Sequence, residues 1–96
     1  MSEGGAGRAV RMVVAGRVQG VGFRYFTRQA AAGLGLVGWV RNLASGEVEV
    51  QVAGPPEKLE AFRGRLRHGP AGSRVDSLIE AELASTPDWT DFRITF

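Results

Sequence analysis

Cysteine is absent from this chain of 96 residues, and histidine occurs once, as His68. The absence of cysteine excludes disulfide bonds, thiolate metal sites and phosphatase mechanisms that use a cysteine nucleophile. A single histidine leaves no second imidazole to complete a zinc site, so we expect no metal site and no bound cofactor. No apolar run approaches the roughly 20 residues that cross a bilayer, and we therefore expect no contact with membranes.

Lysine is also scarce. Lys58 is the only one, and every other basic residue is an arginine. Arginine can bind phosphate through two parallel hydrogen bonds, but an arginine bias can equally reflect the codon composition of a GC-rich genome. The net charge is only +2. The composition therefore does not decide between the two readings, and the arginines beside glycines or turns are the ones to examine.

The length and composition predict one small domain. Hydrophobic residues make up 44% of the chain and charged residues 23%, which is ordinary for a globular protein. We expect residues 1–7, which are small and polar, to form a flexible tail and residues 8–96 to form the domain. The tail lacks the apolar core of a signal peptide. We therefore expect a cytoplasmic protein. We also expect a monomer, with Val50 and Val52 on a possible edge strand leaving dimerisation open.

The spacing of apolar residues predicts the secondary structure. Strict alternation indicates strands, and intervals of three and four residues indicate helices. The expected strands cover residues 10–15, 36–42, 47–53, 73–83 and 91–96, and the expected helices lie between Phe23 and Leu34 and between Pro55 and His68. This order predicts an α+β fold, the ferredoxin-like split βαβ sandwich (βαββαβ), with a last short strand. In that arrangement an antiparallel sheet carries two helices on one face.

The segment from Gly16 to Arg24 joins the first expected strand to the first expected helix, and reads GRVQGVGFR. A turn through glycines into a helix start leaves several backbone N–H groups pointing at one spot, which suits an anion. The glycines alone are equally consistent with a tight turn that needs positive φ. Arg24 favours the anion site, because a cation in the first helical turn is unfavourable by about a few tenths of a kcal/mol unless an anion binds beside it.

Known phosphate and nucleic-acid motifs do not match this segment. A P-loop needs a lysine after its glycines, and a dinucleotide fingerprint needs a third glycine in a longer doubly wound domain. Residues 19–26 partly resemble the aromatic octamer of RNA-recognition domains. That octamer belongs on the third strand, and the expected third strand, from Glu47 to Ala53, has no aromatic residue on which a base could stack. We therefore expect no nucleic-acid partner.

The loop and the segments that follow it closely resemble the acylphosphatase signature. The resemblance rests on GRVQGVGFR at residues 16–24, GLVGWVRN at residues 35–42 and GEVEV at residues 46–50, and continues through Gly54 and Pro55. It covers nearly the whole chain after the tail. It implies an enzyme, acylphosphate phosphohydrolase, that cleaves the carboxyl–phosphate bond of a small acyl phosphate. The products are a carboxylate and inorganic phosphate, and no metal or cofactor takes part.

The resemblance also implies which residues act. Arg24 and the loop amides would bind the phosphoryl group, and Asn42 would be the catalytic asparagine. The residues that carry the loop amides are Val18, Gln19, Gly20, Val21, Gly22 and Phe23. Many members of the family have a threonine after the asparagine, whereas this chain has Leu43, which could alter how the asparagine is supported.

The chemistry of these side chains suggests a mechanism. An acyl phosphate already has a good leaving group, so the protein needs to hold the phosphoryl oxygens and to place a water in line. Asn42 cannot act as a base, because an amide does not titrate, but it can orient the water through its carbonyl oxygen and its N–H₂ group. Neither motif contains a candidate base. We therefore expect a phosphoryl oxygen of the substrate to take the proton.

Two other functions remain open at this point: a phosphate-binding module, and the small RNA-binding domain that the expected third strand already disfavours. A ferredoxin-like domain could hold phosphate or an acyl phosphate without turning it over, and turnover of a synthetic acyl phosphate separates this binding module from an enzyme. Related domains also begin larger carbamoyl-transfer maturation proteins, which continue into zinc-finger segments that this sequence lacks. Several acyl phosphates are candidates, among them glycolytic acyl phosphates, carbamoyl phosphate, acetyl phosphate and phosphorylated aspartate on proteins.

Overall fold

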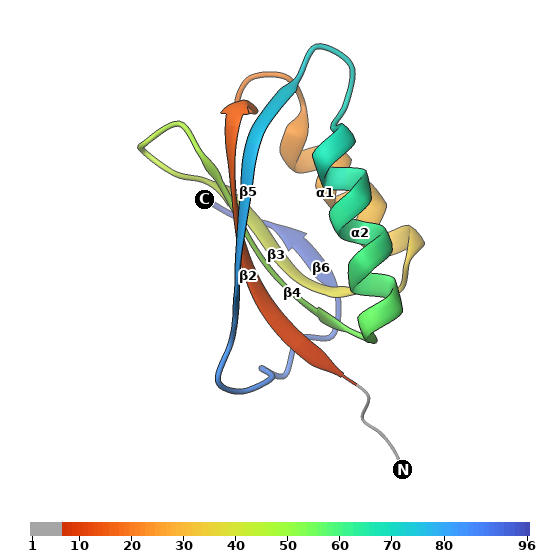
Figure 1. Ribbon diagram of the computed structural model, residues 1–96. Helices are drawn as coiled ribbons and strands as arrows, with labels where there is room; N and C mark the ends of the chain where they lie inside the picture. The colour runs from red at the N-terminus through yellow and green to blue at the C-terminus, as the bar shows by residue number, and fades with distance from the viewer. Residues whose placement is uncertain (1–6) are drawn as a thin grey trace.

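A computed structural model describes residues 7–96 of the chain. The flexible tail predicted for residues 1–7 therefore lies, apart from Gly7, outside the described residues. Seven elements follow one another along the rest of the chain (Figure 1). They are β2 (Arg8–Arg17), α1 (Phe23–Gly33), β3 (Val37–Asn42), β4 (Val48–Gly54), α2 (Pro56–His68), β5 (Arg74–Glu82) and β6 (Phe92–Ile94).

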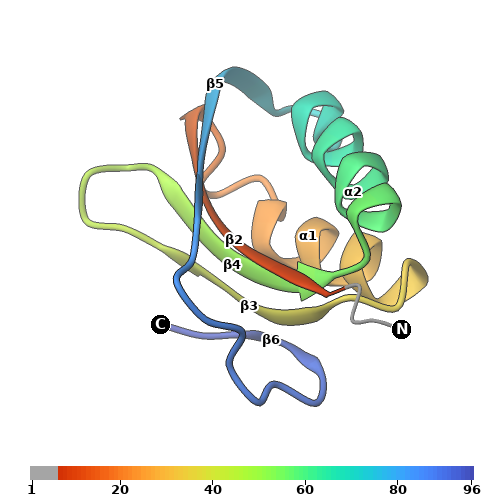
Figure 2. The ribbon, with the colours of Figure 1, turned by 60° about the horizontal axis from the view of Figure 1, so that its bottom comes forward.

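The strands form one five-stranded sheet in the order β5-β2-β4-β3-β6. Both helices lie on one face of this sheet, as Figure 2 shows. The ferredoxin-like α+β fold predicted from the alternation of elements is confirmed, and the element boundaries match those expected to within a few residues. The central pairs, β2 with β4 and β3 with β4, are antiparallel.

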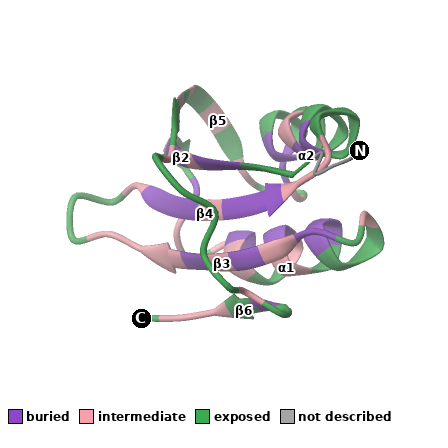
Figure 3. Ribbon diagram, turned by 90° about the horizontal axis from the view of Figure 1, so that it is seen from below, coloured by how far each residue is buried: buried purple, intermediate pink, exposed green. Residues whose placement is uncertain are grey.

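The last strand corrects one detail of the prediction, because the sheet is mixed and not wholly antiparallel. β6 pairs parallel with β3, with Gly38 opposite Phe92 and Val40 opposite Ile94. Figure 3 shows why: the chain leaves β5 at one edge, crosses the face opposite the helices and arrives beside β3 at the other edge. A short apolar strand reveals its own alternation but not its partner, so the sequence pattern left this pairing undetermined.

The core lies between the sheet and the helices. The inward residues of β2 and β4 are the valines and the methionine of the alternating runs, each at most 1% exposed. They are Val10, Met12 and Val14 on β2 and Val48, Val50 and Val52 on β4. From α2, Leu59, Phe62 and Leu66 pack against them. The alternation had left Val50 and Val52 as residues of a possible edge strand open to dimerisation, but β4 lies between β2 and β3 and both side chains are buried.

Two neighbouring strands approach each other closely at Gly38, at the start of β3. Its φ of 143° lies in a region that L side chains rarely adopt, and a Cβ there would overlap the carbonyl oxygen of Gln51 on β4. Gly38 is also the residue whose N–H donates to the carbonyl of Asp91, at 2.8 Å, just before β6. The glycine therefore lets β3 join β4 on one side and the segment before β6 on the other.

Replacement of Gly38 by alanine is expected to lower the free energy of unfolding by about 2–4 kcal/mol, because the new methyl group meets backbone and the φ is strained. Gly64, in the middle of α2, is the matched control: a Cβ there has nothing within 4 Å. Gly64→Ala should raise stability by about 0.5–1 kcal/mol through helix propensity. Urea unfolding of both variants measures this, and equal effects at the two positions would contradict the close approach.

Candidate functional site

The segment between β2 and α1 reverses the chain through two glycines in the left-handed region. Gly20 has a φ of 77° and Gly22 a φ of 75°, and Gly22 is the N-cap residue of α1. A Cβ at either position would find nothing within 4 Å. The glycines are therefore required by the backbone conformation and not by crowding, and the space beside them is open to a ligand. These values are the positive φ that the tight-turn reading of the glycines requires.

The backbone N–H groups of this loop are available to an acceptor. Within residues 7–96, the amides of Val18 to Gly22 donate no hydrogen bond to another protein group. The first helical hydrogen bond runs from the N–H of Phe26 to the carbonyl of Gly22, at 3.0 Å. The amides of Phe23 and Arg24 precede it and have no partner within the helix. No acidic residue occupies the first turn of α1, so the positive end of the helix dipole is not neutralised there.

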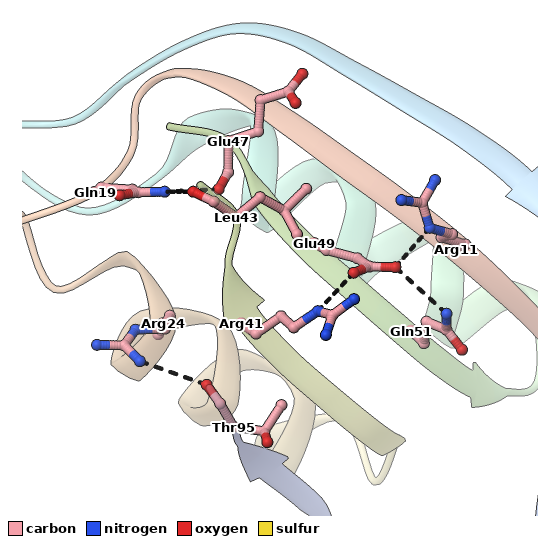
Figure 4. Close-up of polar contacts among 9 residues, drawn as sticks. All are labelled: Arg11, Gln19, Arg24, Arg41, Leu43, Glu47, Glu49, Gln51 and Thr95. Carbon is pink, nitrogen blue, oxygen red and sulfur yellow. Dashed lines mark hydrogen bonds and ion pairs between the residues drawn. The ribbon is translucent and has the colours of Figure 1, made fainter. Parts of the chain in front are cut away.

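Arg24 brings a full positive charge to the same place. Its guanidinium is held from the side of β6: Nη1 donates to the carbonyl of Thr95 at 3.5 Å (Figure 4), and Cζ lies 5.1 Å from the centre of the Phe96 ring. Among the described residues, no carboxylate forms an ion pair with Arg24. The side chain is thus oriented by neutral partners while its charge remains available to an anion.

Asn42, the last residue of β3, lies across a cavity of about 200 Å³ from this loop. In the part of the chain that the structure describes, no hydrogen bond engages its side-chain amide with another protein group. The residues that line the cavity are Val18, Gly20, Gly22, Phe23, Arg24, Tyr25, Asn42 and Ile94. Most of the residues predicted from the sequence are therefore brought together around one space, and all of them come from one chain.

Tyr25 and Ile94 line the cavity, and Thr95 and Phe96 hold Arg24, yet the sequence prediction named none of these four residues. Three of them belong to the end of the chain, where residues 91–96 alternate but reveal no partner. The position of Tyr25, directly after Arg24, was the one available signal, since a residue that follows the anion-binding arginine lies in the same helical turn.

Two predicted loop residues, Gln19 and Val21, do not line the cavity. The side chain of Gln19 turns toward the β3–β4 hairpin, where Nε2 donates to the carbonyls of Leu43 and Glu47, both at 2.8 Å (Figure 4). Val21 packs against the hydrophobic core. Gln19 therefore ties the loop to the hairpin that carries Asn42. Because the bond uses the carbonyl of Leu43, it does not depend on which side chain stands at that position.

The opposite face of the sheet carries an ion-pair network beside Asn42. Glu49 on β4 is only 3% exposed and accepts hydrogen bonds from Nε of Arg11 at 2.6 Å and from Nε of Arg41 at 2.8 Å (Figure 4). Burial by itself raises the pKa of Glu49, but the hydrogen bonds and charges of both arginines outweigh it and hold the pKa below its ordinary value. Arg41 faces away from Asn42, as the regular alternation of side chains along β3 requires.

A larger cavity, of about 580 Å³, lies on this opposite face. Trp39 and Arg41 of β3, residues 88–91 and Arg93 to Thr95 line it. It contains none of the loop residues, neither Arg24 nor Asn42, and its arginines are already paired: Arg41 with Glu49, and Arg93 with Asp91. The smaller cavity is therefore the candidate site, because chemistry and not volume distinguishes the two.

Comparisons with known proteins identify the family of this chain. The family model described as acylphosphatase matches residues 10–94. The chain belongs to the acylphosphatase family. A curated acylphosphatase from Mesorhizobium japonicum is 54% identical over 90 residues, which cover 91% of this chain and 93% of the relative. One from Koribacter versatilis is 50% identical over 84 residues, which cover 88% of this chain and 76% of the relative.

Solved structures lead to the same family. The crystal structure of acylphosphatase from Bacillus subtilis superposes with a TM-score of 0.90 at 37% identity, covering 93% of this chain and 99% of that one. Full-length HypF, in its phosphate- and nucleotide-bound form, matches with a TM-score of 0.87 at 32% identity, but this chain spans only 12% of it. An acylphosphatase-like domain thus occurs both alone and within a much larger protein.

Membrane and metal features complete the description. Neither helix within residues 7–96 is long and apolar enough to cross a membrane. In the same range, no group of three or more histidine or acidic side chains is placed to hold a metal ion.

Gln19→Ala is expected to weaken binding of inorganic phosphate by about 3- to 10-fold, because two hydrogen bonds that fix the loop against the hairpin are lost, at about 1 kcal/mol of net effect. Isothermal titration calorimetry with phosphate measures this. Gln51→Ala is the matched control, since Gln51 lies on the opposite face and its side chain makes a long bond of 3.5 Å to Glu49. An unchanged affinity in Gln19→Ala would contradict the role given to Gln19.

Glu49→Gln is expected to lower the free energy of unfolding at pH 7 by about 1–3 kcal/mol, because Arg11 and Arg41 lose a buried, charged acceptor. The pKa of Glu49 is lowered in the folded state, so its stabilisation is present above the unfolded-state pKa of about 4.3 and is lost as the pH falls through the folded-state pKa. The difference in the free energy of unfolding between wild type and Glu49→Gln should therefore shrink as the pH falls from 5 to 3. Urea unfolding across this range tests it, with exposed Glu60→Gln as the control, and a constant difference would contradict the sign of the shift.

Proposed function

We propose that this protein hydrolyses acyl phosphates in the cavity between the loop of residues 18–23 and Asn42. Water attacks phosphorus, the bond from phosphorus to the acyl oxygen breaks, and a carboxylate and inorganic phosphate leave. The observation that carries the proposal is that, within residues 7–96, the Arg24 guanidinium forms no ion pair and lies beside loop amides that donate no hydrogen bond, at the positive end of α1. Family membership supports the same reaction class.

Arg24 and the loop amides bind the phosphoryl oxygens in this proposal. The guanidinium gives two parallel hydrogen bonds, and charge-assisted bonds of this kind contribute about 1.5–3 kcal/mol each. The amides stabilise the charge that develops on the oxygens in the transition state, as an oxyanion hole does. Because both sets of donors are already in place before substrate arrives, little reorganisation opposes the reaction.

Asn42 positions the attacking water. Its side-chain oxygen accepts a hydrogen bond from the water while its N–H₂ group donates to the water or to a phosphoryl oxygen, which fixes the direction of attack. The absence of any protein partner for this amide within the described residues supports the assignment, since an asparagine that served only the hairpin would bond to nearby backbone groups.

The proton of the water passes to a phosphoryl oxygen of the substrate, because the cavity lining contains no carboxylate, histidine or lysine. The departing carboxylate is a weak base and needs no acid. Neither step uses a metal ion, since the positive charge at the phosphoryl group comes from Arg24 and the amides. The site is complete within one chain, which is consistent with a monomer.

Hydrolysis of benzoyl phosphate, measured with a chelator present, tests the proposal. Arg24→Ala should raise KM and lower kcat by about 10²–10³ or more, because it removes hydrogen bonds to the phosphoryl oxygens that are strongest in the transition state. Asn42→Ala should lower kcat by about 10²–10³ with little change in KM. Arg65→Ala, on the exposed face of α2, is the control and should leave both constants unchanged.

The pH profile adds a second readout. The pH profile of turnover should be the same in His68→Ala as in wild type, because no side chain acts as a base. A folded wild-type protein that binds phosphate but does not turn over benzoyl phosphate would remove the enzyme and leave a binding module.

A further inference from the structure

Exposed large hydrophobic side chains are few on this molecule, and two of them lie at the candidate site. Within the described residues they are Tyr25, at 54% exposed, Ile79, at 68%, and Phe96, at 91%. Tyr25 lines the cavity that contains Arg24 and Asn42, and Phe96 lies against the Arg24 guanidinium. Ile79 belongs to β5, at the far edge of the sheet. Apolar surface that gathers at a site marks a binding contact, whereas a single exposed residue needs no explanation.

Tyr25 is fixed in place before any ligand arrives. Nε2 of Gln29, one helical turn later, donates to the Tyr25 hydroxyl at 3.0 Å, and the Arg28 guanidinium lies 5.2 Å from the centre of the ring. An aromatic ring held in this way loses little conformational entropy when it makes a further contact. The hydroxyl is hydrogen-bonded and Arg28 lies over the ring, so the part of the ring that Arg28 does not cover is the apolar surface that remains for a ligand.

Phe96 lies against the guanidinium of Arg24. The carbonyl of Thr95 accepts a bond from Nη1 of Arg24, and Cζ of Arg24 lies 5.1 Å from the centre of the Phe96 ring. A guanidinium that stacks on a ring through its face keeps its N–H edges free. The arginine can therefore bind a phosphoryl group at its edge while the Phe96 ring extends the apolar surface next to it.

The cavity leaves the acyl group near these two rings. The cavity of about 200 Å³ is lined by loop residues, Arg24, Asn42 and Tyr25, and in the proposed function the phosphoryl group and the water take up this space. A substrate larger than acetyl phosphate must then extend out of the cavity, and Tyr25 is the one aromatic residue in its lining that is exposed, at 54%. The acyl carbon is separated from phosphorus by a single oxygen atom, so the acyl group cannot lie far from the Arg24 side chain and its aromatic neighbours.

We propose that Tyr25 and Phe96 form an aromatic rim that recognises the acyl part of the substrate and makes the enzyme prefer acyl phosphates with a planar apolar group over those with a small one. The proposal rests on the proposed function, because it assigns the phosphoryl group to Arg24 and the loop amides. Both rings are specificity-determining contacts and take no part in bond making. Ile79, equally apolar and exposed but remote, has no such role.

The first test compares benzoyl phosphate with acetyl phosphate. The ratio of their kcat/KM values should fall by about 2- to 10-fold in Tyr25→Ala and in Phe96→Ala, which is the range expected for loss of one aromatic contact. Tyr25→Phe keeps the ring and should keep the ratio within twofold of wild type. Ile79→Ala is the matched control and should leave the ratio unchanged. Circular dichroism establishes that each variant is folded.

The second test separates the rim from the reaction. Benzoylphosphonate and acetylphosphonate resemble the two substrates but have no bond that can be hydrolysed in the same way, and their affinities are measured by calorimetry. If wild type binds benzoylphosphonate more tightly than acetylphosphonate, and Tyr25→Ala and Phe96→Ala lose this difference, the rim is supported. This holds even if wild type turns over no substrate, because a lack of turnover contradicts only the proposed function. Equal affinities for the two phosphonates in wild type overturn the rim, and binding of neither overturns both proposals.

Discussion

Arg24 stands in the first turn of α1, where the dipole of the helix is already positive and no acidic side chain balances it. This uncompensated charge is the constraint on which the site depends, because an anion that binds there relieves both the dipole and the guanidinium. The groups that contact the Arg24 side chain leave this charge uncompensated. The two neutral groups that hold Arg24, the Thr95 carbonyl and the Phe96 ring, orient it without neutralising it.

The order of the strands explains how distant segments reach this charge. β3 lies between β4 and β6, so its end presents Asn42 toward the loop while β6 carries Thr95 and Phe96 past the same helix. The crossing of the chain over the open face of the sheet is what brings β6 there. On that open face the charges are instead paired, with Glu49 between Arg11 and Arg41. The arginines on the open face of the sheet are thus paired with a carboxylate, whereas Arg24, on the helix that covers the other face, has no such partner among the described residues.

The sequence alone was sufficient for the parts of the structure that local patterns determine. Alternation in Val48, Val50 and Val52 marked β4, and glycine and proline spacing marked both helices, because these signals act over a few residues. The loop and Asn42 were identified by resemblance to a family, which no periodicity could supply. The pairing of β6 with β3 and the contact of Thr95 with Arg24 were missed, since the first joins residues 54 positions apart, such as Gly38 and Phe92, and the second joins residues 71 positions apart. The pattern placed Gln19 in the loop, but it did not predict that its side chain turns toward the β3–β4 hairpin.

The hydrogen bonds of Gln19 have a consequence for how the protein moves. One side chain bridges the loop to the carbonyls on both sides of the β3–β4 turn, Leu43 and Glu47. The loop therefore cannot separate from the hairpin unless both bonds break together, and local opening of either segment involves the other. The same two hydrogen bonds thus couple the amides that would hold a phosphoryl group to the strand end that carries Asn42, and they oppose any motion that would separate the two.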